Sequence, residues 1–223
     1  MKKRFLFLLT LILITGCSVK YDVLIDEDLK VYETAEIIGG ENLYKQYYKT
    51  SKVNVLKELL LGYEDVLKDN SYSYELKETD NPYVILNKEY NNLSSYLNDS
   101  QLFNDYFDKI NYNKSDNIIK IETEGFNPNE EDNPDRFYVE NIDISITSKY
   151  EVINSNASKV DENTNTYHFV MDKETEDFKI MLEIDTSKIF NPNKNKILMI
   201  IIAAVVLIIS WIIVFVVNKK KKI

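Results

Sequence analysis

Hydrophobic and polar residues alternate over much of this chain, which is the pattern of β-strands that bury one face. Residues 21–25 and 29–37 form the first such pair and flank an acidic dipeptide, so they predict an opening hairpin. The alternation is clearest at Ile142, Ile144 and Ile146. The other predicted strands are residues 71–77, 83–90, 118–122, 138–147, 150–153, 166–171 and 178–184.

Two segments have the spacing of an amphipathic helix instead. In residues 51–69 the apolar positions recur every three or four residues and form one face. Those positions are Leu56, Leu59, Leu60, Tyr63, Val66 and Leu67. Residues 99–110 repeat the pattern, with Asp99 or Ser100 as the N-cap. We therefore expect an α+β fold, a curved antiparallel β-sheet with about two packed helices.

The chain opens with basic residues and a short apolar run. Residues 5–14 follow Lys2-Lys3-Arg4, and in a helix they reach about 15 Å, half of a hydrocarbon core of about 30 Å. Residues 1–16 therefore predict a cleaved signal peptide. The sequence Ile14-Thr15-Gly16-Cys17 resembles the end of a bacterial lipoprotein signal, which implies that Cys17 is lipidated and becomes the first mature residue. The alternative is an ordinary signal with an incidental cysteine. A lone exported thiol without a disulfide partner in the chain favours the modified cysteine.

A longer apolar run lies near the other end of the sequence. Residues 197–217 are apolar except for one serine, and as a helix they reach about 31 Å, enough to cross a bilayer. Four lysines follow within residues 218–223, and this excess of positive charge predicts a cytoplasmic tail. The sequence thus predicts a bacterial cell-membrane protein whose residues 17–196 form an extracytoplasmic domain.

The charge of that domain is strongly negative. The chain has 27 basic and 36 acidic residues. Three of the basic residues lie in the signal and four in the tail, which leaves 20 basic against 36 acidic and a net charge of −16. Such a domain repels nucleic acid and anionic lipid surfaces, so no nucleic-acid partner is expected. The membrane is the partner that the sequence predicts.

The residues that usually perform catalysis are scarce. His168 is the single histidine and lies in a predicted strand, where a packed or half-exposed side chain is the ordinary role. There is no second histidine, nucleophile elbow or glycine-rich phosphate loop. We therefore expect no enzymatic activity and no cofactor. Carboxylate pairs of the glycosidase type are too abundant to single out one pair.

Two other groups of residues have both a functional and a structural interpretation. The acidic loop 127–135 contains Glu130, Glu131, Asp132 and Asp135, which are hard oxygen ligands for calcium. It lacks the glycine and ligand spacing of known calcium loops, so a solvated turn is favoured. Tyrosines cluster at Tyr44, Tyr47 and Tyr48 and at Tyr72 and Tyr74. Packing at the core edge is favoured over a groove that binds sugar or lipid.

One segment resembles a known family. Residues 150–161 read YEVINSNASKVD, and Tyr167-His168-Phe169 follow. This segment resembles the LppM-type domain of bacterial lipoproteins, in which a strand leads to an Asn-Ala turn, a valine-acidic step and an aromatic-centred return strand. Phe169 stands where related sequences often have tryptophan. The resemblance implies a non-enzymatic, surface-anchored envelope protein with lipid or glycolipid as its ligand, and it implies no particular binding residues.

Two functions therefore remain open, a domain that binds lipid or an accessory subunit that joins an envelope complex through residues 197–217. Both place the two ends of the domain at one membrane. We accordingly expect the first and last strands to run antiparallel, with Tyr21 and Phe190 at the same end of the fold. Asn156 is expected to occupy a left-handed or turn position and to bond the backbone locally.

Overall fold

The computed structural model describes residues 18–39, 44, 50–100, 103–104, 107, 109–124, 141–172, 175 and 178–192. The predicted signal, Cys17, the acidic loop 127–135, the apolar segment 197–217 and the basic tail lie outside the described residues. None of the helices in the described part of the chain combines the length and the apolar character of a membrane span. The chain divides into two compact units. The first holds all the described strands, and the second comprises Glu162–Thr164 and Asn191–Ile223.

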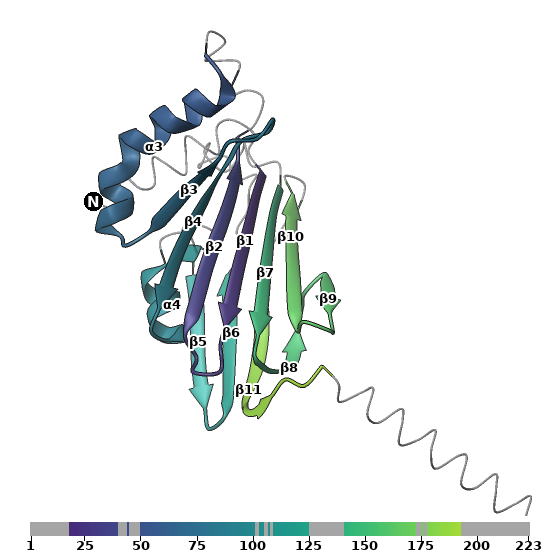
Figure 1. The fold of residues 1–223 in the computed structure, drawn as a ribbon. Coiled ribbons are helices and arrows are strands. Elements are labelled where there is room, and N and C mark those ends of the chain that lie inside the picture. Colours follow the sequence, from purple (N-terminus) through teal and green to yellow (C-terminus); the bar gives the residue numbers. More distant parts are fainter. Residues whose placement is uncertain are drawn as a thin grey trace, which may run out of the picture. The chain divides into compact units, whose positions relative to one another are not determined.

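Eleven described strands form two sheets in the first unit (Figure 1). The seven-stranded sheet has the order β3-β4-β2-β1-β7-β10-β9, and the four-stranded sheet has the order β5-β6-β11-β8. The strands of the first sheet are β1 (Ser18–Ile25), β2 (Val31–Ile38), β3 (Ser73–Lys77), β4 (Tyr83–Tyr90), β7 (Asn141–Ser148), β9 (Lys159–Asp161) and β10 (Thr166–Asp172). Those of the second are β5 (Lys109–Ser115), β6 (Ile118–Glu124), β8 (Tyr150–Ser155) and β11 (Met181–Ile189).

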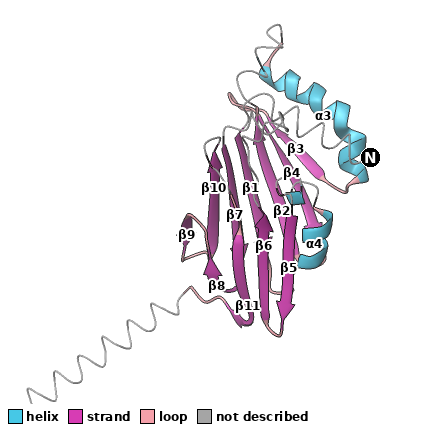
Figure 2. Cartoon of the chain, turned by 180° about the vertical axis from the view of Figure 1, so that it is seen from behind, coloured by secondary structure: helices cyan, strands magenta, loops and turns pink. Residues whose placement is uncertain are grey.

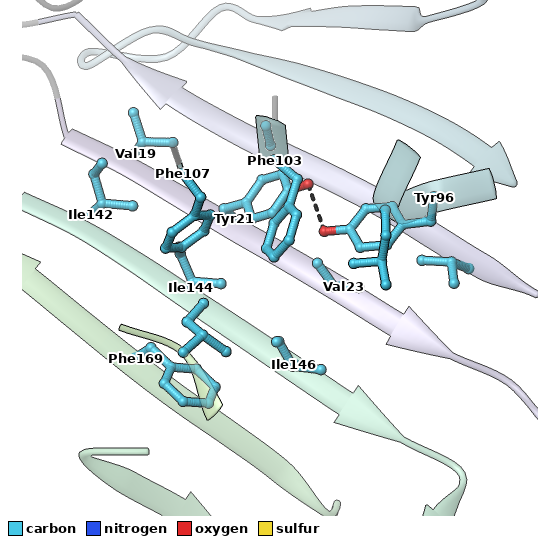
Figure 3. Close-up of a cluster of buried hydrophobic side chains, with 14 of the residues drawn as sticks. Val19, Tyr21, Val23, Tyr96, Phe103, Phe107, Ile142, Ile144, Ile146 and Phe169 are labelled. Atoms are coloured by element: carbon cyan, nitrogen blue, oxygen red, sulfur yellow. Dashed lines mark hydrogen bonds between the residues drawn. The ribbon is translucent and has the colours of Figure 1, made fainter. Parts of the chain in front are cut away.

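The core lies between the two sheets. Strand β1 buries every second residue, and Ile142, Ile144 and Ile146 of β7 continue the same inner face. In the other sheet, Ile119 and Ile184 are fully buried in the same cluster. Figure 3 shows the side chains of the first sheet packing against Phe103 and Phe107. The α+β class is therefore confirmed, but the single curved antiparallel sheet is wrong. There are two sheets, and β1 pairs in parallel with β7.

The described helices agree with the sequence in one case and differ in the other. Helix α3 (Lys52–Asp69) begins at the N-cap Ser51, as the periodicity predicts, and it contacts β3. Helix α4 (Leu93–Asp99) precedes the predicted second helix and contacts β4 and β5, as Figure 2 shows from behind. Ser100 does cap a helical turn, because its hydroxyl accepts a hydrogen bond from the Phe103 amide at 2.9 Å. The helix cannot reach Ile110, because pairing with β6 has already placed Lys109 in β5.

A corner carries the chain from one sheet to the other between β7 and β8. Asn165 adopts a left-handed backbone with φ 57° and sits inside this corner. Its side-chain amide donates to the carbonyls of Ser148 at 2.8 Å and Tyr150 at 2.7 Å. Asn156, in contrast, bonds backbone far along the chain, at Lys179 O and Met181 N, each at 2.7 Å. The expected left-handed backbone and local bonding of Asn156 are therefore wrong, and its side chain instead fastens the end of β8 to the start of β11.

Replacing Asn165 tests the corner. Asn165→Ala removes both bonds to buried carbonyls and places at a left-handed position a residue that adopts this conformation less readily than asparagine, so we expect a loss of about 2–4 kcal/mol in unfolding free energy. Urea unfolding of the full chain in detergent measures it. Asn165→Gly is the matched control, because it keeps the backbone freedom and loses only the bonds. An alanine variant no less stable than the glycine variant would contradict the role of the backbone.

The ends of the domain do not lie where the sequence suggests. The Phe190 amide donates to Lys149 O at 2.8 Å, and the Lys149 amide donates to Ile25 O at 2.9 Å. Phe190 therefore lies at the Ile25 end of β1, whereas Ser18 begins that strand. Since β8 turns back from Tyr150 and β11 is antiparallel to β8, β11 runs in the same sense as β1. The predicted antiparallel arrangement with both termini at one end is wrong.

Candidate functional site

A glutamate is buried among tyrosines on the inner face of the seven-stranded sheet. Glu33 belongs to β2, where it shares the inward-facing positions with Val31, Ala35 and Ile37, and it is 1% exposed. An inward charged residue in an alternating strand is unusual, because removing a carboxylate from water is costly unless hydrogen bonds compensate. Such positions are candidates for function as well as for structure.

Hydroxyl groups from four parts of the chain surround this carboxylate. Tyr21 of β1 donates to Oε1 at 2.8 Å, and Ser100 donates to the same oxygen at 3.0 Å. Tyr90 at the end of β4 donates to Oε2 at 2.5 Å. The hydroxyl of Tyr72, just before β3, lies 3.4 Å from both oxygens.

A row of packed aromatic rings continues from the Glu33 cluster into the core. The hydroxyls of Tyr21 and Tyr96 lie 2.9 Å apart, the contact drawn as a dashed line in Figure 3. The Phe103 ring packs against both tyrosine rings, with centroid distances of 6.3 Å to Tyr21 and 5.2 Å to Tyr96. Phe103 then contacts Phe107 at 4.9 Å, and Phe107 contacts Phe178 at 6.1 Å. Packed rings therefore fill the interior along this line.

The electrostatics of the cluster follow from its burial. Desolvation raises the pKa of Glu33, and hydrogen bonds from Tyr90, Tyr21 and Ser100 oppose that rise. Burial together with the Glu33 charge also raises the pKa of Tyr21 and of Tyr90 above the usual value for phenols. The tyrosines consequently keep their protons and act as hydrogen-bond donors.

One cation stands beside the cluster. Lys88 lies directly opposite Glu33 in the β2–β4 register. Its Nζ is 4.5 Å from the centroid of the Tyr90 ring and 5.0 Å from that of Tyr72. Burial lowers the pKa of Lys88, and the negative charges of Glu33 and Asp99 oppose that change. The lysine thus offsets part of the buried charge across the faces of two aromatic rings.

This geometry suits a structural role better than catalysis. A carboxylate has about four lone-pair positions, and the donors from Tyr21, Ser100, Tyr90 and Tyr72 occupy them. The Glu33 carboxylate therefore has no free acceptor position for a substrate. It joins β1, β2, β4 and the end of α4 through one group.

His168 lies in a second polar cluster on the outer face of the same sheet. Its Nδ1 is 3.0 Å from Ser145 Oγ and 3.5 Å from Asp143 Oδ1. A Ser-His-Asp triad needs the serine and the carboxylate on opposite ring nitrogens, and here both approach Nδ1. Nearby, partial burial raises the pKa of Asp22, while a hydrogen bond from Ser145 lowers it. His168 is thus a half-exposed strand histidine that links β10 to β7.

Other residues singled out in the sequence have ordinary places. Tyr72 belongs to the Glu33 cluster, while Tyr44 and Tyr74 pack against the core and Lys52 Nζ lies 5.1 Å from the Tyr44 ring centroid. Tyr47 and Tyr48 lie outside the described residues. In the part of the chain that the structure describes, no group of three His, Cys, Asp or Glu side chains suits a metal ion. Glu33 was not among the predicted site residues, although its inward place in the alternation of β2 was the available signal.

The two-sheet α+β architecture is an LppM-like fold, as a comparison with solved structures shows. The NMR structure of the folded domain of the Mycobacterium tuberculosis LppM protein is similar to this chain with a TM-score of 0.50 and 10% sequence identity. The similarity covers 80% of this chain and 93% of that domain. The resemblance predicted from residues 150–169 is therefore confirmed at the level of the fold. A scan against protein-family models finds no match, and a search of curated proteins finds none either.

Proposed function

We propose that this chain is a non-enzymatic, membrane-anchored lipoprotein of the bacterial cell envelope whose domain binds lipid or glycolipid at its surface. The observation that supports the proposal most is the LppM-like fold, together with the sequence features that flank it. The lipid on Cys17 and the span at residues 197–217 are the two proposed anchors. The domain between them is proposed to lie on the extracytoplasmic side, with the C-terminus in the cytoplasm.

Two features of the described domain support a role without catalysis. The buried carboxylate of Glu33 is saturated by hydroxyl donors, and the Ser145-His168-Asp143 group has the wrong geometry for nucleophile activation. Such groups hold strands in place. They provide no activated group that faces a substrate.

The distribution of exposed apolar side chains supports contact with lipid at the surface. Seven large hydrophobic side chains are exposed on the described residues, and four of them belong to strands β8, β9, β10 and β11. These four are Ile153, Val160, Val170 and Ile189. Because packed rings fill the interior between Tyr21 and Phe178, we place the lipid contact on the exposed faces of these four strands.

Lipid that copurifies with the full chain tests this proposal. We expect the double variant Val160→Ser/Val170→Ser, purified from membranes in mild detergent, to retain severalfold less lipid than the unaltered chain. Quantitative lipid mass spectrometry measures the ratio. Leu61→Ser is the matched control, because Leu61 is the most exposed apolar side chain at 69% and belongs to α3. Equal losses in both variants, or no lipid on the unaltered chain, would contradict specific binding.

A further inference from the structure

We propose that the domain lies on its side along the membrane, with strand β1 held near the bilayer at both of its ends. The proposal rests on the two anchors of the proposed function. It concerns the interaction surface, because it assigns the bilayer to a long side of the domain and not to an end. Phe190 lies at the end of β1 opposite to Ser18.

The two points where the chain leaves the domain are separated by the length of β1. Cys17 directly precedes Ser18, the first residue of β1. Phe190 is bonded to Lys149, which is bonded to Ile25 at the far end of that strand. Seven residue steps of about 3.3 Å separate Ser18 from Ile25, so the two exits lie about 23 Å apart.

The chain that follows Phe190 is short, so the distance of about 23 Å between the two exits limits how the domain can be oriented. Seven residue steps lead from Phe190 to Ile197, where the apolar segment begins, and they span at most about 24 Å when fully extended. A relaxed chain of this length spans only about 15 Å. If the domain stood upright on its Ser18 end, the linker would have to be stretched to its limit.

The opposite upright orientation conflicts with the lipid anchor. A domain standing on its Phe190 end would raise Ser18 about 23 Å above the bilayer. No residue lies between Cys17 and β1 that would allow the lipid to reach the membrane. Only an orientation close to the membrane plane keeps both anchors seated with a relaxed linker.

Charge does not produce this orientation. The domain has an excess of acidic residues, which an anionic lipid surface repels. The two tethers therefore hold the domain down against a repulsion that salt screens. It follows that raising the ionic strength should bring the Ile25 end of the domain closer to an anionic bilayer.

Fluorescent labels at the two ends of the first hairpin test the orientation. Lipidation would consume the thiol of the chain's single cysteine, so an introduced cysteine is the reactive one. Lys20→Cys marks the Ser18 end and Asp28→Cys marks the Ile25 end, and both side chains are exposed. The full chain is reconstituted in phosphatidylcholine vesicles that contain a lipid with a nitroxide on its headgroup. We expect the nitroxide to quench both labels to about the same extent.

Two matched variants separate the possible orientations. A long Gly/Ser insertion after Pro192 should abolish quenching at Asp28→Cys and preserve it at Lys20→Cys, because it frees one end. Replacing Cys17 with serine frees the other end, so it should abolish quenching at Lys20→Cys and preserve it at Asp28→Cys. If the unaltered linker leaves Asp28→Cys unquenched while Lys20→Cys is quenched, the domain stands upright and the proposal fails. The mass of the N-terminal peptide tests lipidation of Cys17 independently, so a failed anchor is distinguished from a wrong orientation.

Discussion

Glu33→Ala is expected to lower the unfolding free energy by about 3–5 kcal/mol, because it leaves a cavity and removes the common acceptor of several buried hydroxyls. Tyr21, Tyr90 and Ser100 all donate to this carboxylate. Each hydroxyl left without an acceptor stays buried away from water without a compensating hydrogen bond, which lowers the stability of the folded state. Urea unfolding of the full chain in detergent measures the loss.

Glu33→Gln separates the charge of this side chain from its shape. Burial raises the pKa of Glu33 above its ordinary value of 4.5, so the folded state binds the proton more tightly than the unfolded state. The contribution of this group to stability is thus fully present below pH 4.5 and is lost as the pH rises through the folded pKa. We expect the stability advantage of the unaltered chain over Glu33→Gln to shrink across that rise. An advantage that grows with pH would contradict a desolvated carboxylate.

Phe103→Ala is the second change with a large expected effect, a loss of about 3–5 kcal/mol in unfolding free energy. The Phe103 ring is 1% exposed and contacts the rings of Tyr21, Tyr96 and Phe107. Removing it opens a cavity where the Glu33 cluster meets the core between the sheets. Thermal or urea unfolding provides the measurement.

A control at the surface distinguishes loss of packing from a general intolerance of aromatic substitution. Tyr112 of β5 is 38% exposed, and we expect Tyr112→Ala to change stability by less than about 1 kcal/mol. A combined Phe103→Ala/Glu33→Ala variant should lose less than the sum of the single losses, because both residues contact Tyr21. Full additivity would indicate that the carboxylate cluster and the row of packed aromatic rings are independent.

The Glu33 cluster explains how an LppM-like fold tolerates a charge in its core. The carboxylate receives donors from β1, β4 and the segments before β3 and after α4, and Lys88 offsets its charge through two rings. Replacement of a fully bonded buried charge by an apolar side chain of similar size is often neutral for stability in other proteins. The cluster therefore specifies how these segments meet more than it increases stability.

Local patterns in the sequence predicted most elements, because period and capping depend on neighbouring residues. The strands around Ile142, the helix after Ser51 and the hairpin of β1 and β2 all follow from spacing alone. The second helix was predicted too long. Ser100 caps a helical turn at Phe103 and Asn104, but pairing with β6 places the chain from Lys109 in a strand. Tertiary pairing overrode the local signal there.

The site was less predictable than the elements. The alternation in β2 places Glu33 inward, but it does not say that Tyr21, Tyr72, Tyr90 and Ser100 converge on it. These residues are separated by up to 79 positions, between Tyr21 and Ser100. The pairing of β2 with β1 and β4, together with the packing of α4 beside β4 and β5, brings them together.

By itself, the sequence determined the α+β class, most strands and the first helix, because periodicity and capping are local properties; it also predicts the two proposed anchors from apolar length and terminal charge. Tertiary structure alone decided that the strands form two sheets and that β1 pairs in parallel with β7. It also decided that Phe190 lies beside the end of β1 that is opposite to Ser18. The physical reason is that strand partners and strand direction depend on contacts between distant residues. No local pattern of hydrophobic and polar positions encodes such contacts.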